Sequence, residues 1–251
     1  MKNVKLASVA STNKYCEALD LMQVEDFTCF WALEQTSGVG QRGNVWHAAP
    51  GENLSVSLVL HHTFLPADHQ FRLTQMLSLA VVDFLAAIDP SLHTSIKWPN
   101  DIVVDGKKIC GMLTSTRLQG NSLAAAVCGI GININETEFP AWVPHPTSLA
   151  LLTGHHYDLE SLLNNLLHCT ERRYNALRAG NTLGGEYLSH LLNYGVEADY
   201  LLTGTQYPQP TPLRATITGV DIYGHLLLTA ADGRRHCCAM KEIALVSAID
   251  A

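Results

Sequence analysis

The sequence is poor in charged and aromatic residues, which make up 16% and 7% of its 251 positions, and acidic side chains outnumber basic ones. A formal net charge of -7 gives no overall basic surface, so we expect no nucleic acid partner. No apolar run approaches the roughly 18 residues of a membrane helix. The N-terminus has no long apolar stretch typical of a signal peptide. The composition therefore predicts a globular protein without a membrane partner, with one large core and room for a small second domain.

Cysteine pairs with metal-ligand spacing are also missing. The seven cysteines form no C-x-x-C motif, and several lie in apolar runs such as AAAVCGIGI. We expect them to be small buried side chains in a reducing compartment, which predicts a cytoplasmic location. The histidine pairs 61–62 and 155–156 lack metal-ligand spacing and are expected in exposed turns. No metal site made of protein side chains is predicted.

Hydrophobic patterning predicts alternating strands and helices in the first 200 residues. Strands are expected at 4–10, 27–33, 53–60 and 122–135, and a hairpin within 94–118 should turn at Asp105-Gly106, a pair that favours a type I′ turn. Helices are expected at 11–22, capped by Ser11 or Thr12, at 68–88, and across 158–193. This order predicts an α+β fold with a mixed sheet in residues 1–200.

The amino-acid composition changes after Tyr200. The segment GTQYPQPTPLRATITGV is rich in proline, threonine and glycine, and short alternating strands with turns at YGH and ADGRR follow it. This pattern predicts a small all-β, barrel-like domain in residues 201–251.

Four polar or glycine-rich segments lie where core strands end: STN at 11–13, GVGQRG at 38–43, KWPNDIVVDGKKICG at 97–111, and GIGININ at 129–135. The second is not a dinucleotide-binding fingerprint, because it leads from a strand to another strand rather than to a helix. No G-x-x-x-x-G-K-[ST] motif occurs, which excludes a P-loop.

The third segment carries the most specific side chains. Lys97 ends a strand and is able to neutralise a phosphate, whereas Asp101 is able to orient or deprotonate an amine. Lys108 lies on the return strand of the hairpin, and either a site residue or a solvated edge lysine fits its position. The alternative interpretation is structural: the charged side chains form surface ion pairs, and Asn100-Asp101 forms a turn.

Together the segments indicate a phosphate or adenylate held by glycine backbone, with Lys97 compensating charge. Such a site suits activation of a carboxylate by ATP, with Mg²⁺ bridging the phosphates.

The order STN, GVGQRGNVW, KWPNDI, GKKICGML and GIGININ resembles the biotin protein ligases over nearly the whole chain. The resemblance implies a class II synthetase-like catalytic domain, an SH3-like C-terminal domain, and a reaction in two steps. Biotin and ATP first form biotinyl-5′-AMP, and a lysine of a biotin carboxyl carrier domain then takes the biotinyl group. Family members occur as monomers and dimers, so a homodimer is one expectation. Because the first expected strand starts close to Met1, we expect no N-terminal DNA-binding domain, and hence no repressor role.

The resemblance also assigns residues. Catalysis falls to Lys97, Asp101, Lys108 and Arg42. Biotin binding falls to Ser11, Thr12, Asn13, Gln35, Gly38, Val39, Gly40, Gln41, Lys97, Gly111 and Gly129. Binding of ATP and the adenylate falls to Gln41, Arg42, Gly43, Asn44, Trp46, Lys97, Asn100, Asn133 and Asn135. Gly111 and Gly129 should leave room around the biotin rings.

One departure concerns the loop. The family's common pattern is Gly-Arg-Gly-Arg, whereas Val39 and Gln41 replace both arginines here. With fewer cationic contacts, we expect looser retention of the adenylate unless another residue compensates. Two alternatives remain: a lipoate or octanoyl transferase on a related fold, and a biotin- or adenylate-sensing protein that has lost activity.

Overall fold

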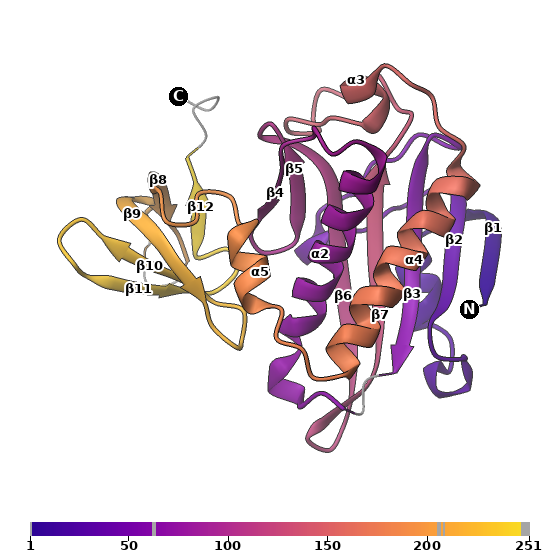
Figure 1. The fold of residues 1–251 in the computed structure, drawn as a ribbon, viewed down its shortest axis with the longest axis horizontal. Helices are drawn as coiled ribbons and strands as arrows, with labels where there is room; N and C mark the ends of the chain where they lie inside the picture. The colour runs from indigo at the N-terminus through magenta and orange to yellow at the C-terminus, as the bar shows by residue number, and fades with distance from the viewer. Residues whose placement is uncertain (1, 62–63, 205–206, 208, 247–251) are drawn as a thin grey trace.

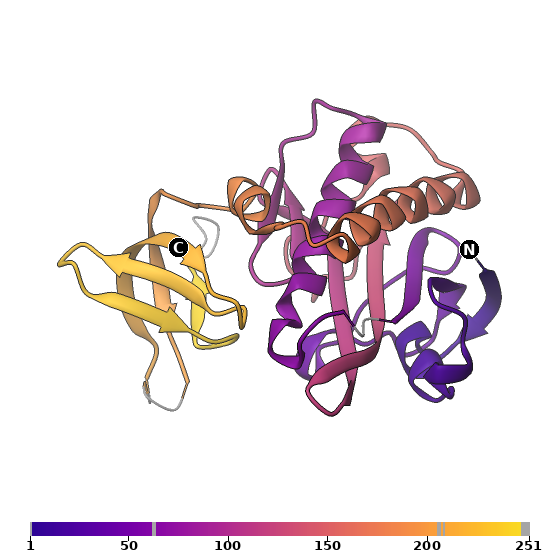
Figure 2. The same ribbon diagram turned by 60° about the horizontal axis from the view of Figure 1, so that its bottom comes forward.

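A computed structural model describes residues 2–61, 64–204, 207 and 209–246, apart from the side chain of Arg42. Two β-sheets organise the chain, a seven-stranded sheet and a five-stranded sheet that lies beside it (Figures 1 and 2). The architecture is α+β, as the sequence predicted.

The large sheet contains β1 to β7 in the spatial order β1-β2-β3-β7-β6-β5-β4. Only the pairing of β1 with β2 is parallel, and the other five pairings are antiparallel. The expected mixed sheet is therefore confirmed. In chain order the strands are Asn3–Val9, Thr28–Gln35, Asn53–His61, Thr94–Lys97, Asp101–Val104, Lys107–Gln119 and Ser122–Asn133.

The expected hairpin joins β5 to β6. Asp105 and Gly106 have φ angles of 49° and 77°, the two positive values that a type I′ turn requires. The turn therefore brings Lys108 back beside the strand that begins at Asp101.

Two long helices, α2 (Phe71–Ile88) and α4 (Leu159–Arg178), cover one face of the large sheet (Figure 1). The short α1 (Thr12–Glu17), with Ser11 as its N-cap, packs with Phe30, Val59 and Val127 in a second, smaller cluster. Because both faces of β3 are covered, the side chains that point to either face are buried along almost the whole strand. Leu54, Val56 and Leu58 belong to the main core, and the intervening Ser55 and Ser57 are buried as polar side chains.

By length and composition alone, the segment Ala67–Ile88 is apolar enough to span a membrane, but 67% of that window is buried inside the protein. It is the central core helix of this fold.

The remaining helices are short. They are α3 (Leu149–Thr153), which the sequence pattern did not predict, α5 (Gly184–Ser189), and the single 3₁₀ turns Leu21–Gln23, Gln41–Gly43 and Ala67–His69.

The small sheet has the order β11-β10-β9-β8-β12, with every pairing antiparallel. Its strands are β8 (Glu197–Leu202), β9 (Thr211–Val220), β10 (Leu226–Ala230), β11 (Arg235–Cys238) and β12 (Ile243–Leu245). The expected boundary at residue 201 falls inside β8, because the strand starts four residues before the change in composition. An SH3-like classification of this sheet stays a prediction.

All seven cysteines are free, and six of them are buried, as expected for small apolar side chains. Burial raises the pKa of the Cys16 and Cys29 thiols to about 12. Cys237 is the exception because it is exposed on β11. His155 and His156 are exposed as expected, in the loop between α3 and α4, whereas His61 is half-buried at the end of β3, and His62 lies outside the described residues.

Candidate active site

A cavity of about 580 Å³ lies between the large and small sheets. That volume is in the usual range for small-molecule sites. Fifteen of the residues that the sequence assigned to the site line it: Ser11, Thr12, Asn13, Gln35, Val39, Gly40, Gln41, Asn44, Trp46, Lys97, Asn100, Asp101, Lys108, Gly111 and Gly129. Segments up to 118 residues apart in sequence therefore meet in one place.

Small residues in register hollow out this face of the sheet. Gly111 pairs with Gly131, which pairs in turn with Ser55, and the adjacent row pairs Gly129 with Ser57. Directly opposed residues in antiparallel strands share a face, so these rows leave a depression rather than a layer of side chains. The motif glycines thus act together, across three strands.

Uncharged polar groups form one end of the cavity. The Gln35 Oε1 atom accepts hydrogen bonds from the Thr12 backbone N–H (2.8 Å) and hydroxyl (3.2 Å), and Gln35 Nε2 donates to Ser55 Oγ (3.3 Å). The Ser57 hydroxyl lies 2.8 Å from Thr12 Oγ1. This end carries donors and acceptors without charge, as a neutral polar ligand requires.

Protein side chains already occupy part of the room above the glycines. A Cβ added at Gly129 would lie 2.2 Å from Asn13 Oδ1, and one at Gly131 would lie 2.4 Å from the Trp46 ring. At Gly111, the nearest atoms are those of Trp46 (2.9 Å) and Lys108 (3.2 Å). These glycines let Asn13 and Trp46 approach the sheet, and their contact with biotin rings stays a prediction.

The glycine-rich loop folds back on itself. The Trp46 backbone N–H donates to the Gly38 carbonyl (3.0 Å), and Gly40 N–H donates to the Asn44 carbonyl (2.7 Å). These bonds hold Trp46 against β6 and β7, where its indole Nε1 is buried without a hydrogen-bond partner among the described residues. A buried unpaired donor beside a cavity is available to a ligand.

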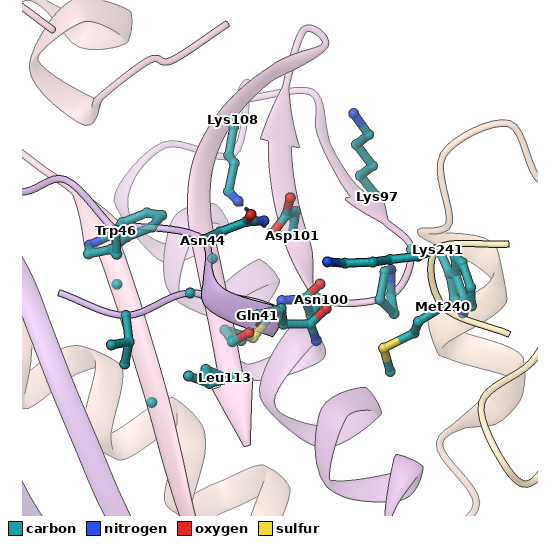
Figure 3. A pocket seen from close by; sticks show the side chains of 18 of the residues that line it. Gln41, Asn44, Trp46, Lys97, Asn100, Asp101, Lys108, Leu113, Met240 and Lys241 are labelled. Carbon is teal, nitrogen blue, oxygen red and sulfur yellow. Dashed lines mark hydrogen bonds and ion pairs between the residues drawn. The ribbon is translucent and has the colours of Figure 1, made fainter. Parts of the chain in front are cut away.

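Charged groups form the other end of the cavity, where Asp101 and Lys108 make an ion pair of 2.8 Å across β5 and β6 (Figure 3). The Lys108 ammonium also lies 5.6 Å from the centre of the Trp46 ring. Asp101 is the only carboxylate among the described lining residues, against three lysines, 97, 108 and 241. The charged end is therefore net cationic, which suits a phosphate-bearing ligand.

Lys241 reaches this end from the small sheet and was not predicted from the sequence. Figure 3 shows its ammonium directed toward Asn100 and Asp101, whereas the exposed Lys97 side chain extends away from them. Met240, Asn193 and Tyr200 also line the cavity from outside the predicted motifs. No local pattern marks these residues, because Met240, Lys241 and Tyr200 reach the site only when the small sheet docks, and Asn193 comes from the segment between α5 and β8.

Asn100 has a structural part as well. Its side chain donates to the Met112 carbonyl, and its own carbonyl accepts from Met112 N–H at 3.0 Å. These bonds fasten the KWPND turn to β6 and hold Asp101 at the start of its strand.

Two residues assigned to the nucleotide make structural contacts, and their nucleotide role stays a prediction. Asn133 and Asn135 do not line the cavity. The Asn135 amide is used by the backbone of Tyr157, and Asn133 donates to the Thr147 carbonyl at 2.9 Å. Both side chains fasten the segment that follows β7, and the polar end of the GIGININ strand therefore has a structural role.

The remaining loop residues are less defined as ligands. Gly38 and Gly43 do not line the cavity, and Gly43 adopts a φ of 87° that suits glycine. The side chain of Arg42 lies outside the described residues, so its role stays a prediction.

A buried carboxylate below the loop was also missed. Glu136 accepts hydrogen bonds from Ala49 N–H (3.1 Å) and from the Asn53 amide, and its Oε1 atom lies 2.6 Å from His47 Nε2. With its side chain only 3% exposed, Glu136 fixes the end of the glycine-rich loop to the start of β3. His47 follows Trp46 directly, so the network positions the tryptophan.

The family model described as the biotin/lipoate A/B protein ligase family matches residues 5–133, just over half of the chain. A bifunctional ligase/repressor BirA of Bacillus spizizenii is 31% identical over 231 residues, which are 90% of this chain and 68% of that protein. A biotin–[acetyl-CoA-carboxylase] ligase of Paracoccus denitrificans is 34% identical over 168 residues, covering 64% of this chain and 68% of that protein.

Among solved structures, a biotin protein ligase from Aquifex aeolicus in complex with biotin and ATP superimposes with a TM-score of 0.78. The two are 24% identical, and the match covers 98% of this chain and 99% of that one, so both sheets share its fold. The chain belongs to the biotin/lipoate A/B protein ligase family and, within it, to the biotin protein ligases.

Proposed function

We propose that this chain is an ATP-dependent ligase that activates biotin as biotinyl-5′-AMP and transfers it to a lysine of a biotin carboxyl carrier domain. One observation carries the proposal: a single cavity joins an uncharged polar end at Thr12, Gln35 and Ser55 to a cationic end with three lysines. Biotin has a neutral polar ring system and a carboxylate tail, and ATP is a polyanion, so the two would meet head to tail in this cavity.

In the first step, a biotin carboxylate oxygen attacks the α-phosphorus of ATP and pyrophosphate leaves, which gives the mixed anhydride. Negative charge develops on the phosphate oxygens, and Lys97, Lys108 and Lys241 line the end of the cavity where it would be stabilised. The Trp46 ring and its unpaired N–H lie beside that end and would contact the nucleotide.

In the second step, the amine of the acceptor lysine attacks the anhydride carbonyl and AMP leaves. The amine must lose a proton, and Asp101 is the carboxylate within the cavity that would orient and accept it. Lys108, 2.8 Å away, fixes the position of that carboxylate. The glycine-rich loop would shield the anhydride, which hydrolyses readily, from water.

The donor set at the cationic end fits Mg²⁺ held mainly by ATP. Asp101 is the only carboxylate lining the described cavity, and Mg²⁺ commonly uses one or two carboxylates together with substrate phosphates and water. When bound, the ion would neutralise the leaving pyrophosphate.

The expected partner is a carrier domain, and the expected location is the cytoplasm, which seven free cysteines suit. The absence of a nucleic acid partner and the oligomeric state stay predictions, since relatives include proteins named ligase/repressor.

The deciding experiment measures biotin-dependent exchange of pyrophosphate into ATP, followed by transfer to a carrier domain. We expect both half-reactions with biotin and neither with lipoate. Lipoate-dependent exchange would favour the transferase alternative, and loss of exchange with retained biotin binding would favour the binding-protein alternative.

A further inference from the structure

The small sheet carries a cluster of metal-ligand side chains outside the active-site cavity. Asp221, His225 and Cys237 each offer a ligand atom, and all three atoms lie within 4.8 Å of one another. The histidine Nδ1 and an Asp221 carboxylate oxygen are already 2.9 Å apart. A tetrahedral zinc ion with sulfur, nitrogen and oxygen ligands would hold such atoms about 3.5 Å apart. A modest movement of the exposed Cys237 side chain would therefore complete three coordination positions.

The turn that carries two of these ligands is held in shape by its own hydrogen bonds. The second carboxylate oxygen of Asp221 accepts from the backbone N–H groups of Tyr223 (2.9 Å) and His225 (2.8 Å). The Asp221 N–H donates to the His225 carbonyl (3.0 Å), and Gly224 adopts a φ of 90°. Aspartate and histidine are thus fixed on one side of the turn before an ion arrives, which lowers the cost of ordering the ligands.

The charge around the cluster favours a cation. Asp221 and Glu242 both place negative charge near the Cys237 thiol. The nearby Arg234 is committed to Asp232, with its Nε atom 2.6 Å from that carboxylate. A thiolate and an imidazole select zinc-like ions rather than Mg²⁺ or Ca²⁺, which prefer oxygen ligands.

We propose that Asp221, His225 and Cys237 form a binding site for one zinc-like transition-metal ion, separate from the ATP site, with water as the fourth ligand. The ion ties β11 to the turn at 221–225. That turn contacts the large domain, because the Gly224 carbonyl accepts a hydrogen bond from the Trp98 indole (3.0 Å) and the glycine packs on the Phe71 ring. Metal binding therefore braces the contact between the small sheet and the KWPND turn.

The test uses the full-length, tag-free protein after treatment with a chelator. Zn²⁺ is titrated against a chromophoric chelator, and Co²⁺ is added separately to record its absorption spectrum. We expect one ion per chain and a sulfur-to-cobalt charge-transfer band. Cys237→Ser should remove the charge-transfer band. Cys237→Ser and Asp221→Asn should each weaken Zn²⁺ binding by about tenfold or more.

Two controls separate this site from other histidines and carboxylates. Asp199→Asn removes an exposed carboxylate from β8 of the same sheet, where Arg214 keeps its ion pair with Glu197, and the double variant His155→Gln/His156→Gln removes an exposed histidine pair. Both should bind Zn²⁺ as the unaltered protein does. In the unaltered chain, Zn²⁺ but not Mg²⁺ should slow alkylation of Cys237, the one exposed cysteine. Binding of less than one Zn²⁺ ion per chain would overturn the proposal. So would Zn²⁺ binding that Cys237→Ser leaves unchanged, or alkylation of Cys237 that Zn²⁺ does not slow.

Discussion

Asp101 and Lys108 illustrate how a single backbone turn makes a pair of site residues. The type I′ turn at Asp105-Gly106 folds β6 against β5 with Lys108 paired to Val103, and the two charged groups lie 2.8 Å apart. The sequence placed both residues near the turn, but it left open whether their side chains face each other. The register decides this, because Lys108 pairs with Val103, and Asp101 lies two residues from Val103 and therefore on the same face of the sheet.

Replacement of Asp101 by asparagine should separate the two half-reactions. The amide keeps the size of the side chain but is a poor proton acceptor, so transfer to the carrier should slow by about 100-fold. Formation of the adenylate should fall far less, because that step needs no proton acceptor. Exchange of pyrophosphate and transfer from preformed biotinyl-AMP are measured separately. Equal losses in the two assays would contradict the assigned role.

Replacement of Lys97 by alanine should nearly abolish adenylate formation, with a loss of about 100-fold or more in exchange rate. The side chain is exposed at the cavity and makes no hydrogen bond or ion pair with the described residues, so the thermal midpoint should change little. Lys107→Ala, an exposed lysine on β6 outside the cavity lining, is the matched control. Near-normal exchange in the Lys97 variant would refute the role.

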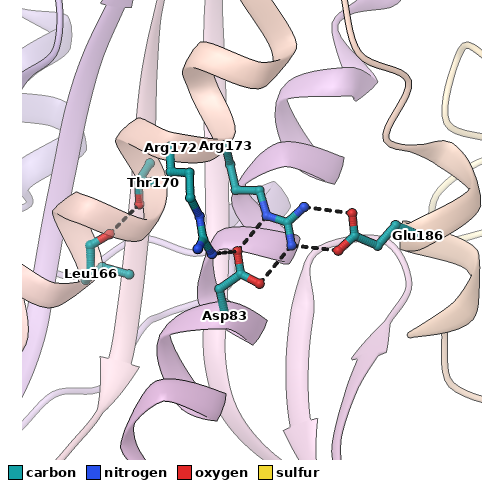
Figure 4. Close-up of polar contacts among 6 residues, drawn as sticks. All are labelled: Asp83, Leu166, Thr170, Arg172, Arg173 and Glu186. Atoms are coloured by element: carbon teal, nitrogen blue, oxygen red, sulfur yellow. Dashed lines mark hydrogen bonds and ion pairs between the residues drawn. The ribbon is translucent and has the colours of Figure 1, made fainter.

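At the scale of elements, the helices that support the sheet are joined by a charged network (Figure 4). Arg173 of α4 binds the Asp83 carboxylate of α2 through two nitrogens (2.6 and 2.7 Å) and the Glu186 carboxylate of α5 through two more contacts (2.7 and 2.6 Å). Both groups of the Asp83–Arg173 pair are largely shielded, with side chains 18% and 15% exposed. The sequence predicted these helices from their apolar periodicity. That periodicity does not reveal which charged side chains meet where the helices pack against each other.

Stability should depend on pH through this network. Burial acts to raise the pKa of Asp83, but hydrogen bonds from Arg173 and Arg172 outweigh it and hold that pKa below its ordinary value of 3.8. A group with a lowered folded-state pKa contributes stability above its unfolded value and loses it as the pH falls through the folded value. Asp83→Asn should therefore lower the free energy of unfolding by about 1–3 kcal/mol at pH 7 and flatten its decline below about pH 4.

Denaturant unfolding of the unaltered chain and the variant, at pH 7 and pH 3, measures both effects. Glu138→Gln, a change at an exposed carboxylate outside this network, is the control and should leave the profile unchanged. A parallel decline of stability in the Asp83 variant and the unaltered chain would show that the network does not carry the pH dependence.

At the scale of the whole molecule, the cavity is complete only because the small sheet docks beside the large one. Lys241 and Met240 line it from the segment between β11 and β12, and Trp98 fastens the small sheet through Gly224. This arrangement affects the charge around the glycine-rich loop, which lacks arginines at positions 39 and 41. A cation from the small sheet is available to compensate for them.

Lys241→Ala should accordingly raise the KM for ATP and speed the release of biotinyl-AMP, each by about tenfold, with little change in biotin affinity. Arg235→Ala, which removes an exposed cation from β11, should leave both quantities unchanged. Stopped-flow displacement of the adenylate measures its release. If the Lys241 variant retains the adenylate as long as the unaltered chain, the small sheet does not compensate for the missing arginines.

The sequence by itself determined the strands, the long helices, the hairpin turn and fifteen of the residues that line the cavity. The elements and the turn follow from local chemistry, because periodicity selects the elements and glycine permits the turn. Polar side chains at strand ends mark a ligand edge, and the resemblance to biotin protein ligases assigned the individual site residues. The same local reasoning did not reveal that Asn133 and Asn135 hydrogen-bond to the backbone of later segments, because a polar strand end suits either a ligand or such a contact.

Only the tertiary structure decided the parallel pairing of β1 with β2, the cross-strand rows of glycine and serine, the Glu136 network, and the arrival of Lys241. These features depend on which strands become neighbours and on how two sheets dock. Such long-range contacts are set by the shape and packing of the whole molecule, and no window of the sequence contains both partners.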